Sequence, residues 1–250
     1  MPRKNPLDPP KPGVTEAVRR GLSYELLART LAYPDPGALE SIRDVAGLSL
    51  ALHPEGPVSE LARAFIDHSR SDLEAEYIEL FTLATSPDCP TYESAYVCTD
   101  INQQTSIMAD VSGFYRAFGL ELGQGLRPDD ISLELEFLGF LCRKEAYAIE
   151  HMGKPRVLQA RRNQRVFISE HLGRWGETLG HLIAGHAAAG SPYQALGAAL
   201  AAWVEAERRL AGVLDAAVVA RPAMPFPDQR RDVGPNNASL ITAEQILETR

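Results

Sequence analysis

Acidic side chains are concentrated in two segments of the sequence. Clustered carboxylates can bind cationic ligands through charge-assisted hydrogen bonds. Residues 121–136 contain five Asp and Glu residues against Arg127 alone. Residues 67–79 also contain five Asp and Glu residues, with Arg70 as the one basic residue. We interpret the second segment as a solvated helix face. The first segment is therefore the candidate for binding.

Four carboxylates of this first segment have different expected roles. Asp129 and Asp130 precede a helical pattern, so one of them is predicted to cap its N-terminus, where the helix dipole favours negative charge. Glu134 and Glu136 lie inside a helix that is otherwise apolar. A carboxylate there must find a partner, because its desolvation is costly. The partner could be an internal arginine, a backbone donor or a visiting peptide.

Enzyme signatures are absent from the sequence. There is no phosphate-binding loop, GxSxG turn, HExxH or Glu-x-x-His pair, and the three cysteines form no CxxC. His181 and His186 are five residues apart and cannot share a helix face as i, i+4 ligands do. Glu134 and Glu136 would point about 200° apart on a helix, which makes them a poor acid–base pair. We predict no catalytic residue, no metal site and no cofactor; a helical enzyme using buried carboxylates is the less favoured alternative.

The composition excludes several classes of partner. Twenty-five basic against 33 acidic residues leave a formal charge of −8, which disfavours nucleic acid and anionic membranes and suits a basic partner. The Arg-rich stretch 156–165 is interpreted as a solvated helix face. The N-terminus has no apolar signal region, and the longest apolar run, 195–204, is about half of what a bilayer needs. We predict a cytoplasmic protein without stable membrane insertion.

A helical period of apolar residues runs through most of the chain, with no convincing strand. Leu and Ala dominate the apolar residues, which favours helix packing. Proline and glycine clusters divide the pattern into predicted helices at 14–33, 37–52, 58–83, 99–119, 131–151, 155–175, 177–189 and 192–214. The sequence therefore predicts an all-α fold, a single globular helical bundle of about eight or more helices.

Three regions follow from this organisation. Residues 1–13 are predicted to be a flexible N-terminal arm, residues 14–220 the all-helical domain, and residues 221–250 a C-terminal extension in which the helical period lapses. A sub-boundary near 120–130 stays open, because a glycine-rich turn lies there.

A proline-bounded connection over residues 84–98 carries Tyr92, Glu93, Ser94 and Tyr96. A connection of this length without secondary structure is often functional. The two tyrosine rings could plug the core, or they could form the rim of a peptide-binding site, for which aromatic residues are typical.

Five short motifs follow one another in a fixed order: YIELF from residue 77, PTYESAY from 90, FYRAFGL from 114, PDDI from 128 and ELEFL from 134. That succession resembles the TorD/DmsD/NarJ family of redox-enzyme maturation chaperones, and the likeness covers residues 24–209. Asp130 stands where the family usually has the histidine of a Pro-x-Asp-His motif. Any role of that histidine is therefore not assigned to Asp130, whereas the acidic character of the motif is kept.

The resemblance implies an all-helical, non-enzymatic, TorD-like chaperone of the cytoplasm. Its partners would be the apo-form of a molybdopterin-containing oxidoreductase of the DMSO reductase family and the N-terminal twin-arginine signal peptide of that enzyme. The chaperone would assist cofactor insertion and proofread its client before export by the Tat pathway. The resemblance does not name the client, decide whether it is exported, or fix the oligomeric state.

The residues and the resemblance point to one binding site for a client peptide. Carboxylates would select its arginines, because hydrogen bonds to charged groups contribute about 1.5–3 kcal/mol each, and aromatic rings would bury its apolar segment. The predicted site residues are Tyr92, Glu93, Ser94, Tyr96, Phe114, Tyr115, Pro128, Asp129, Asp130, Glu134, Glu136 and Phe137. On this hypothesis, Asp129→Ala or Glu134→Ala weakens peptide binding without unfolding the protein. The main alternative is a helical scaffold or assembly protein that recognises a folded partner.

Overall fold

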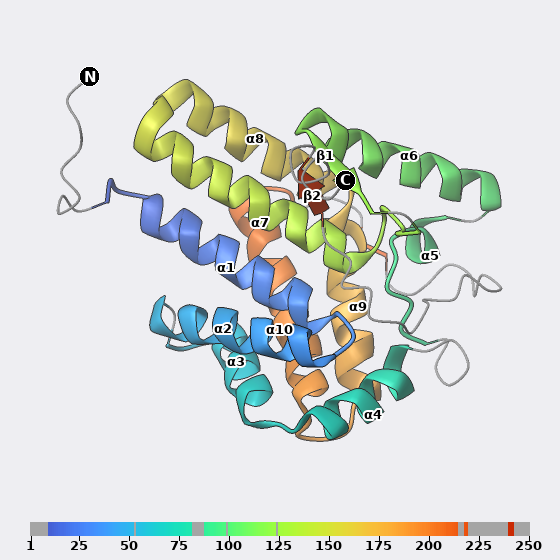
Figure 1. Ribbon diagram of the computed structural model, residues 1–250. Coiled ribbons are helices and arrows are strands. Elements are labelled where there is room, and N and C mark those ends of the chain that lie inside the picture. The colour runs from blue at the N-terminus through green and yellow to red at the C-terminus, as the bar shows by residue number, and fades with distance from the viewer. Residues whose placement is uncertain are drawn as a thin grey trace, which may run out of the picture.

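The computed structural model describes residues 10–52, 54–81, 88–98, 100–123, 125–214, 218–219 and 240–242. Within these ranges the chain forms ten α-helices, one π-helical turn and two short strands (Figure 1). The α-helices are α1 (Val14–Thr30), α2 (Pro36–Leu52), α3 (Pro57–Asp67), α4 (Arg70–Phe81), α5 (Ser94–Val97), α6 (Ile101–Ala117), α7 (Ile131–Tyr147), α8 (Lys154–Glu170), α9 (Leu172–His186) and α10 (Pro192–Ala211). The π turn is η1 (Ala148–Met152), and the strands are β1 (Leu120–Leu122) and β2 (Leu240–Thr242). The prediction of an all-α helical bundle is confirmed.

Two pairs of long helices organise the bundle: α1 lies along α7, and α9 lies along α10 (Figure 1). The second pair is close because glycines lie at its contact. A Cβ added to Gly180 would lie 2.6 Å from the backbone nitrogen of Ala201, and one added to Gly197 would lie 2.3 Å from that of Ala184. A larger residue at either glycine would push the two helices apart, because protein interiors have no spare volume at such contacts.

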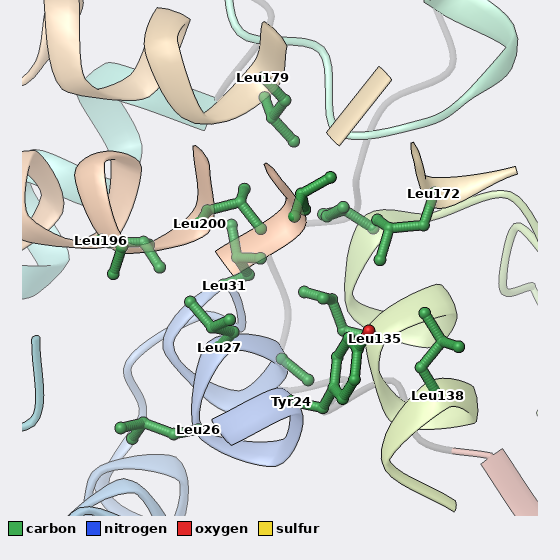
Figure 2. Packing of buried hydrophobic residues seen from close by; sticks show 14 of the residues in the cluster. Tyr24, Leu26, Leu27, Leu31, Leu135, Leu138, Leu172, Leu179, Leu196 and Leu200 are labelled. Atoms are coloured by element: carbon green, nitrogen blue, oxygen red, sulfur yellow. The ribbon is translucent and has the colours of Figure 1, made fainter. Parts of the chain in front are cut away.

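Leucines of these four helices and of the turn after α1 fill the core between the pairs (Figure 2). Leu27 and Leu31 come from the α1 side, Leu135 from α7, Leu179 from α9 and Leu200 from α10, and all are fully buried. Helix α7 has buried residues on nearly all sides. The helix whose sequence is apolar on nearly all sides is thus the one surrounded by other elements.

Two predicted helix boundaries are wrong. The predicted helix 58–83 is divided into α3 and α4 at His68 and Ser69, where Ser69 Oγ accepts a hydrogen bond from the Asp72 amide in the manner of an N-cap (3.3 Å). The predicted boundary near residue 176 lies earlier, at His171, between α8 and α9. The other predicted helices are present with ends shifted by a few residues, and the helix from 131 ends in the π turn η1.

A short pair of strands also departs from the sequence prediction. β1 pairs antiparallel with β2, with Leu120 opposite Thr242 and Leu122 opposite Leu240. Gly119 lies between α6 and β1 with φ of +71°, the left-handed conformation that glycine commonly adopts after the end of a helix. Residues 240–242 of the predicted extension thus return to the bundle. Residues 1–9 of the predicted arm and the rest of the extension beyond 220 lie outside the described residues.

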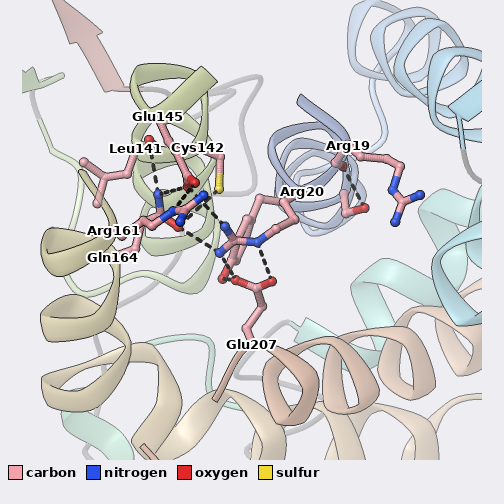
Figure 3. A network of polar contacts seen from close by, with 10 residues as sticks. Arg19, Arg20, Leu141, Cys142, Glu145, Arg161, Gln164 and Glu207 are labelled. Atoms are coloured by element: carbon pink, nitrogen blue, oxygen red, sulfur yellow. Dashed lines mark hydrogen bonds and ion pairs between the residues drawn. The ribbon is translucent and has the colours of Figure 1, made fainter. Parts of the chain in front are cut away.

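Arg20 of α1 is buried, and its guanidinium binds side chains of three other helices (Figure 3). Its Nε and Nη2 donate to the two carboxylate oxygens of Glu207 on α10 (2.8 and 2.5 Å), and Nη2 also donates to Gln164 Oε1 on α8 (2.8 Å). Its Nη1 lies 3.4 Å from Glu145 Oε2 on α7, which also accepts from Gln164 Nε2 (2.9 Å). We call these four residues the Arg20 cluster. The sequence did not predict it, because its other members are at least 125 residues from Arg20 along the chain.

Several surface predictions can be checked on the described residues. Arg156, Arg161, Arg162 and Arg165 of α8 are all exposed, as predicted for a solvated face. The three cysteines are free and buried. No described helix has both the length and the apolar character that a membrane span requires.

Candidate functional site

The predicted loop site and the predicted acidic segment are joined by backbone hydrogen bonds. Tyr92 and Asp130 form an isolated antiparallel bridge. The Glu93 amide donates to the Asp129 carbonyl, and the Ile131 amide donates to the Thr91 carbonyl, both at 2.8 Å. The connection predicted to lack structure also contains the short helix α5. These bonds hold Glu93 directly beside the start of α7.

Asp129 and Asp130 are adjacent but have separate roles. Asp130 is the N-cap of α7, and its Oδ1 accepts from the Ser132 amide (2.9 Å) and from Ser132 Oγ (2.5 Å). The prediction that one of the two aspartates caps this helix is therefore confirmed. Asp129 is fully buried, and its Oδ2 accepts from the Ser94 amide at the start of α5 (3.1 Å).

Arg127 neutralises Asp129 from within the same turn. Its Nε and Nη2 donate to the two oxygens of Asp129 (3.1 and 3.0 Å), and Nη2 also donates to Ser94 Oγ (2.9 Å). The guanidinium carbon lies 4.2 Å from the centre of the Tyr92 ring, within cation–π distance. The one basic residue of the acidic segment is thus used inside the protein.

A break between α8 and α9 directs His171 into the interior. His171 has φ −126° and ψ −101°, outside the helical region, and its side chain is almost fully buried. Gly173 permits the break, because a Cβ there would lie 2.3 Å from the carbonyl oxygen of Ile168. His171 Nδ1 lies 2.9 Å from Glu93 Oε2, while its Nε2 has no hydrogen-bond partner in the described part of the chain.

Glu93 is buried and only partly satisfied. Burial raises the pKa of Glu93 above its usual value, because a carboxylate loses its hydration inside the protein, and His171 acts in the opposite direction through its hydrogen bond and charge. The second oxygen, Oε1, has no hydrogen bond to any described residue. Arg174 Nη1 lies 3.8 Å from Oε1, too far for a hydrogen bond.

Glu134 has a similar environment on α7. It is fully buried, and Trp175 Nε1 donates to its Oε2 at 3.3 Å, while Oε1 lacks a hydrogen-bond partner among the residues described. Burial raises the pKa of Glu134 well above its usual value, and the charges of Glu93 and Asp129 raise it further. Glu136 is half-buried and lies two residues further along the same helix, so the two carboxylates do not face one site.

The predicted aromatic residues divide into buried and half-buried members. Tyr96 and Tyr115 are buried and donate to the carbonyls of Pro90 (2.8 Å) and Pro128 (2.9 Å). Tyr96 packs on Trp175, and the buried Phe137 packs on Tyr115. Tyr92 and Phe114 are half-buried. The first group supports the site, and the second group reaches its surface.

The contacts described above link all the predicted site residues except Phe114 and Glu136. Eight of the twelve are buried: Glu93, Ser94, Tyr96, Tyr115, Asp129, Asp130, Glu134 and Phe137. The half-buried ones are Tyr92, Phe114, Pro128 and Glu136. The carboxylates therefore do not line an open cleft. Asp129→Ala is also a poor test of binding alone, because Asp129 holds Arg127 and the start of α5.

Three residues of this region were not predicted from the sequence: His171, Trp175 and Arg174. We call Glu93, Asp129, Glu134 and His171 the Glu93 cluster. A signal for the break at His171 was present, because Gly173 and Gly176 lie inside an otherwise helical pattern, where glycine is unfavourable. The pairing of His171 with Glu93 could not be read from the sequence, since 78 residues separate the two.

The sequence matches the profile of the nitrate reductase delta subunit family over residues 51–179. Because that match spans more than half of the 250 residues, the chain belongs to this family. The resemblance to redox-enzyme maturation chaperones is thereby confirmed. All the predicted site residues lie within the matched range.

Three curated relatives are named as reductase assembly chaperones. The chain is 30% identical to the perchlorate reductase assembly chaperone protein of Dechloromonas aromatica (strain RCB), over 65% of this chain and 76% of the relative. It is 28% identical to the selenate reductase assembly chaperone protein of Thauera selenatis (79% and 91%). It is 25% identical to the chlorate reductase assembly chaperone protein of Ideonella dechloratans (65% and 85%). These relatives are chaperones and not catalysts, which confirms the prediction of a non-enzymatic protein.

A solved structure is also similar. A crystal structure described as a redox enzyme maturation protein from Archaeoglobus fulgidus matches 66% of this chain and 98% of its own, with 22% identity and a TM-score of 0.39.

Proposed function

We propose that this chaperone works in the cytoplasm and binds the N-terminal twin-arginine signal peptide of a molybdopterin-containing reductase. It holds the apo-enzyme until the cofactor is inserted and only then releases it for export. The assembly-chaperone names of the three relatives support a reductase as the client. The acidic composition supports a cationic peptide as the part that is recognised.

The observation that carries the proposal is the loose pair formed by Glu93 and Arg174. Glu93 Oε1 accepts no hydrogen bond from the described residues and lies 3.8 Å from Arg174 Nη1. The Arg174 side chain is about one-third exposed, whereas Glu93 is fully buried. A long, partly exposed side chain can move aside at little cost. A client arginine then takes its place and gives Glu93 the two-pronged hydrogen bond that it lacks.

The half-buried rings provide the apolar part of the site. Phe114 packs edge-on against His171, next to Glu93, and Tyr92 lies under the Arg127 guanidinium. Burying a few hundred Å² of the apolar segment against these rings contributes several kcal/mol at about 25 cal/mol per Å². After the costs of association and peptide ordering, the affinity is on the order of micromolar. Such an affinity suits a client that must later be released.

Calorimetry with two synthetic peptides tests the proposal. One peptide carries two arginines before an apolar run, and the other has lysines in their place. The arginine peptide should bind about tenfold more tightly, because a lysine ammonium cannot make the two-pronged bond to a carboxylate. In Glu93→Gln this preference should disappear.

An exposed carboxylate provides the control. Glu121→Gln changes the net charge equally and should keep the preference for arginine, since Glu121 is exposed on β1. Equal affinity for both peptides, or an unchanged preference in Glu93→Gln, would contradict the proposal. Tight binding of a folded client that lacks its leader peptide would instead support the scaffold alternative.

A further inference from the structure

Three potential metal ligands meet where α6 approaches the break between α8 and α9. Asp110 lies on α6, Glu170 is the last residue of α8, and His171 is the residue at the break. One ligand atom from each lies within 4.8 Å of the others. His171 Nε2 and Asp110 Oδ2 are 3.7 Å apart.

His171 is held as metal-binding histidines are held. Its side chain is 1% exposed, and the rings of Phe114 and Phe167 pack against the imidazole. With the proton on Nδ1, the ring donates to Glu93 Oε2 at 2.9 Å. That arrangement leaves the lone pair of Nε2 on the side of Asp110. A carboxylate behind a histidine fixes the tautomer and ring orientation in this way at metal sites.

The Nε2 atom is the independent sign of a ligand. It is buried and has no hydrogen-bond partner among the described residues, although unsatisfied buried polar groups are uncommon and costly. Asp110 and Glu170 are exposed, so their carboxylates can move toward it by rotation of their own side chains. A metal ion between the three groups would satisfy the nitrogen and neutralise both carboxylates.

We propose that Asp110, Glu170 and His171 bind a divalent transition-metal ion, with Zn²⁺ as the best fit. One imidazole and two carboxylates are ligands that Zn²⁺ accepts, and they bind at about 2.0–2.2 Å. Tetrahedral bonds of that length place ligand atoms about 3.4 Å apart. The 3.7 Å contact is near this value, and the remaining gap closes by a small movement of exposed side chains. Three protein ligands leave a fourth position open at the surface.

No metal-ligand motif in the sequence predicts this site, because motifs of that kind bring together ligands that are close along the chain. Here one ligand comes from a different helix, and the histidine points inward only because α8 ends at Glu170. Arg174 Nη1 donates to the backbone carbonyl of Glu170 (3.3 Å) and lies 3.8 Å from Glu93 Oε1. The bound ion would link α6 to the junction of α8 and α9 and so stabilise the folded state.

Zinc binding to the purified full chain tests the proposal without any client peptide, so its outcome does not depend on the proposed function. Calorimetry should find one Zn²⁺ site in the wild type, and added Zn²⁺ should raise the melting temperature. In Asp110→Asn or Glu170→Gln the affinity should fall at least about tenfold, and the thermal shift should be lost. Bound Co²⁺ should give the visible absorption of a four-coordinate site in the wild type only.

The chain contains a closely matched control. Asp88 lies 3.7 Å from His186 Nε2, as Asp110 does from His171 Nε2, and the two aspartates are 61% and 62% exposed. The histidines differ, since His186 is 41% exposed and His171 1%. No third ligand completes the pair of Asp88 and His186 among the described residues, so Asp88→Asn should change zinc affinity less than twofold. The proposal is overturned if the wild type binds Zn²⁺ no better than Asp110→Asn, or if Asp88→Asn loses as much affinity.

Discussion

The Arg20 cluster and the Glu93 cluster are both buried groups of charged side chains, yet they differ in how fully they are satisfied. Both oxygens of Glu207 accept from Arg20, and both oxygens of Glu145 have partners, one of them Arg161 Nε at 2.6 Å. In the Glu93 cluster, by contrast, Glu93, Glu134 and His171 each keep one atom without a hydrogen bond to a described residue.

The difference separates a structural network from a binding region. A fully paired buried network fixes the relative positions of its helices, and removal of one member leaves the others unpaired. A partly paired network costs free energy that the rest of the protein must supply. Proteins keep such groups mainly at functional sites. We therefore assign the Arg20 cluster to the fold and the Glu93 cluster to function.

The largest expected loss of stability comes from a substitution in the Arg20 cluster. Arg20→Met leaves Glu207 buried without its cation, while Glu145 keeps Arg161; breaking a buried pair in this way costs about 3–5 kcal/mol of the free energy of unfolding. Urea denaturation followed by circular dichroism measures the loss. Arg209→Met removes an exposed i, i+4 pair with Glu205 and should cost less than about 1 kcal/mol. Equal losses of stability in the two variants would contradict the claim that the buried Arg20 cluster stabilises the fold more than an exposed ion pair does.

The next largest expected effect is a difference in stability between substitutions of the neighbouring residues Asp129 and Asp130. Asp129→Ala removes the acceptor of the Ser94 amide and the partner of Arg127, and we expect a loss of about 2 kcal/mol in the free energy of unfolding. Asp130→Ala removes the N-cap of α7 and should cost about 1 kcal/mol. The same denaturation measurement compares them. A larger loss in Asp130→Ala would show that Arg127 does not depend on Asp129.

Glu134 should make stability depend on pH. Below about pH 4.3 its side chain is protonated in both the folded and unfolded states. Above that pH the unfolded chain releases the proton first, because burial raises the folded-state pKa. Relative to Glu134→Gln, the wild type should therefore lose about 1.4 kcal/mol per pH unit until the folded-state pKa is passed. Urea denaturation from pH 4 to 8 measures the difference, and parallel curves would contradict the assignment.

The smallest expected effect concerns Arg174 and has the opposite sign. Arg174→Ala removes the cation that competes for Glu93 Oε1, so the arginine peptide should bind about threefold more tightly, a gain of about 0.6 kcal/mol. Arg165→Ala, which removes an exposed arginine of α8, is the charge-matched control. Weaker binding in Arg174→Ala than in Arg165→Ala would mean that Arg174 holds the peptide and does not cover the site.

Most of the fold could be predicted because helical period and helix-ending residues are local properties of the sequence. Gly190, Ser191 and Pro192 show this: Gly190 has φ of +77°, and Ser191 Oγ accepts from the Gln194 amide before a helix that begins at Pro192. Glycine at a helix end, serine at an N-cap and proline at the first helical position are signals that the sequence alone displays. The break at His171 was not predicted, because it depends on the close approach of Gly173 to Ile168 and on the hydrogen bond between His171 and Glu93.

The candidate site was predicted in its location but not in its geometry. Tyr92, Glu93 and the aspartates at 129 and 130 were chosen by residue type and order, and the structure joins them through backbone bonds. Their burial could not be predicted, because Arg127 and His171 supply internal partners from other segments. A sequence shows which residues carry charge, whereas tertiary packing decides which charges remain available.

Hydrogen exchange measured by mass spectrometry, with and without the arginine peptide, tests the central claim most directly. The account predicts slower exchange in residues 88–98 and 125–137 and in the junction of α8 and α9 when the peptide is bound. Exchange around Arg20 in α1 and Glu207 in α10 should stay unchanged. Protection confined to α1 and α10, or no protection in the Glu93 cluster at saturating peptide, would contradict the assignment of function to the Glu93 cluster.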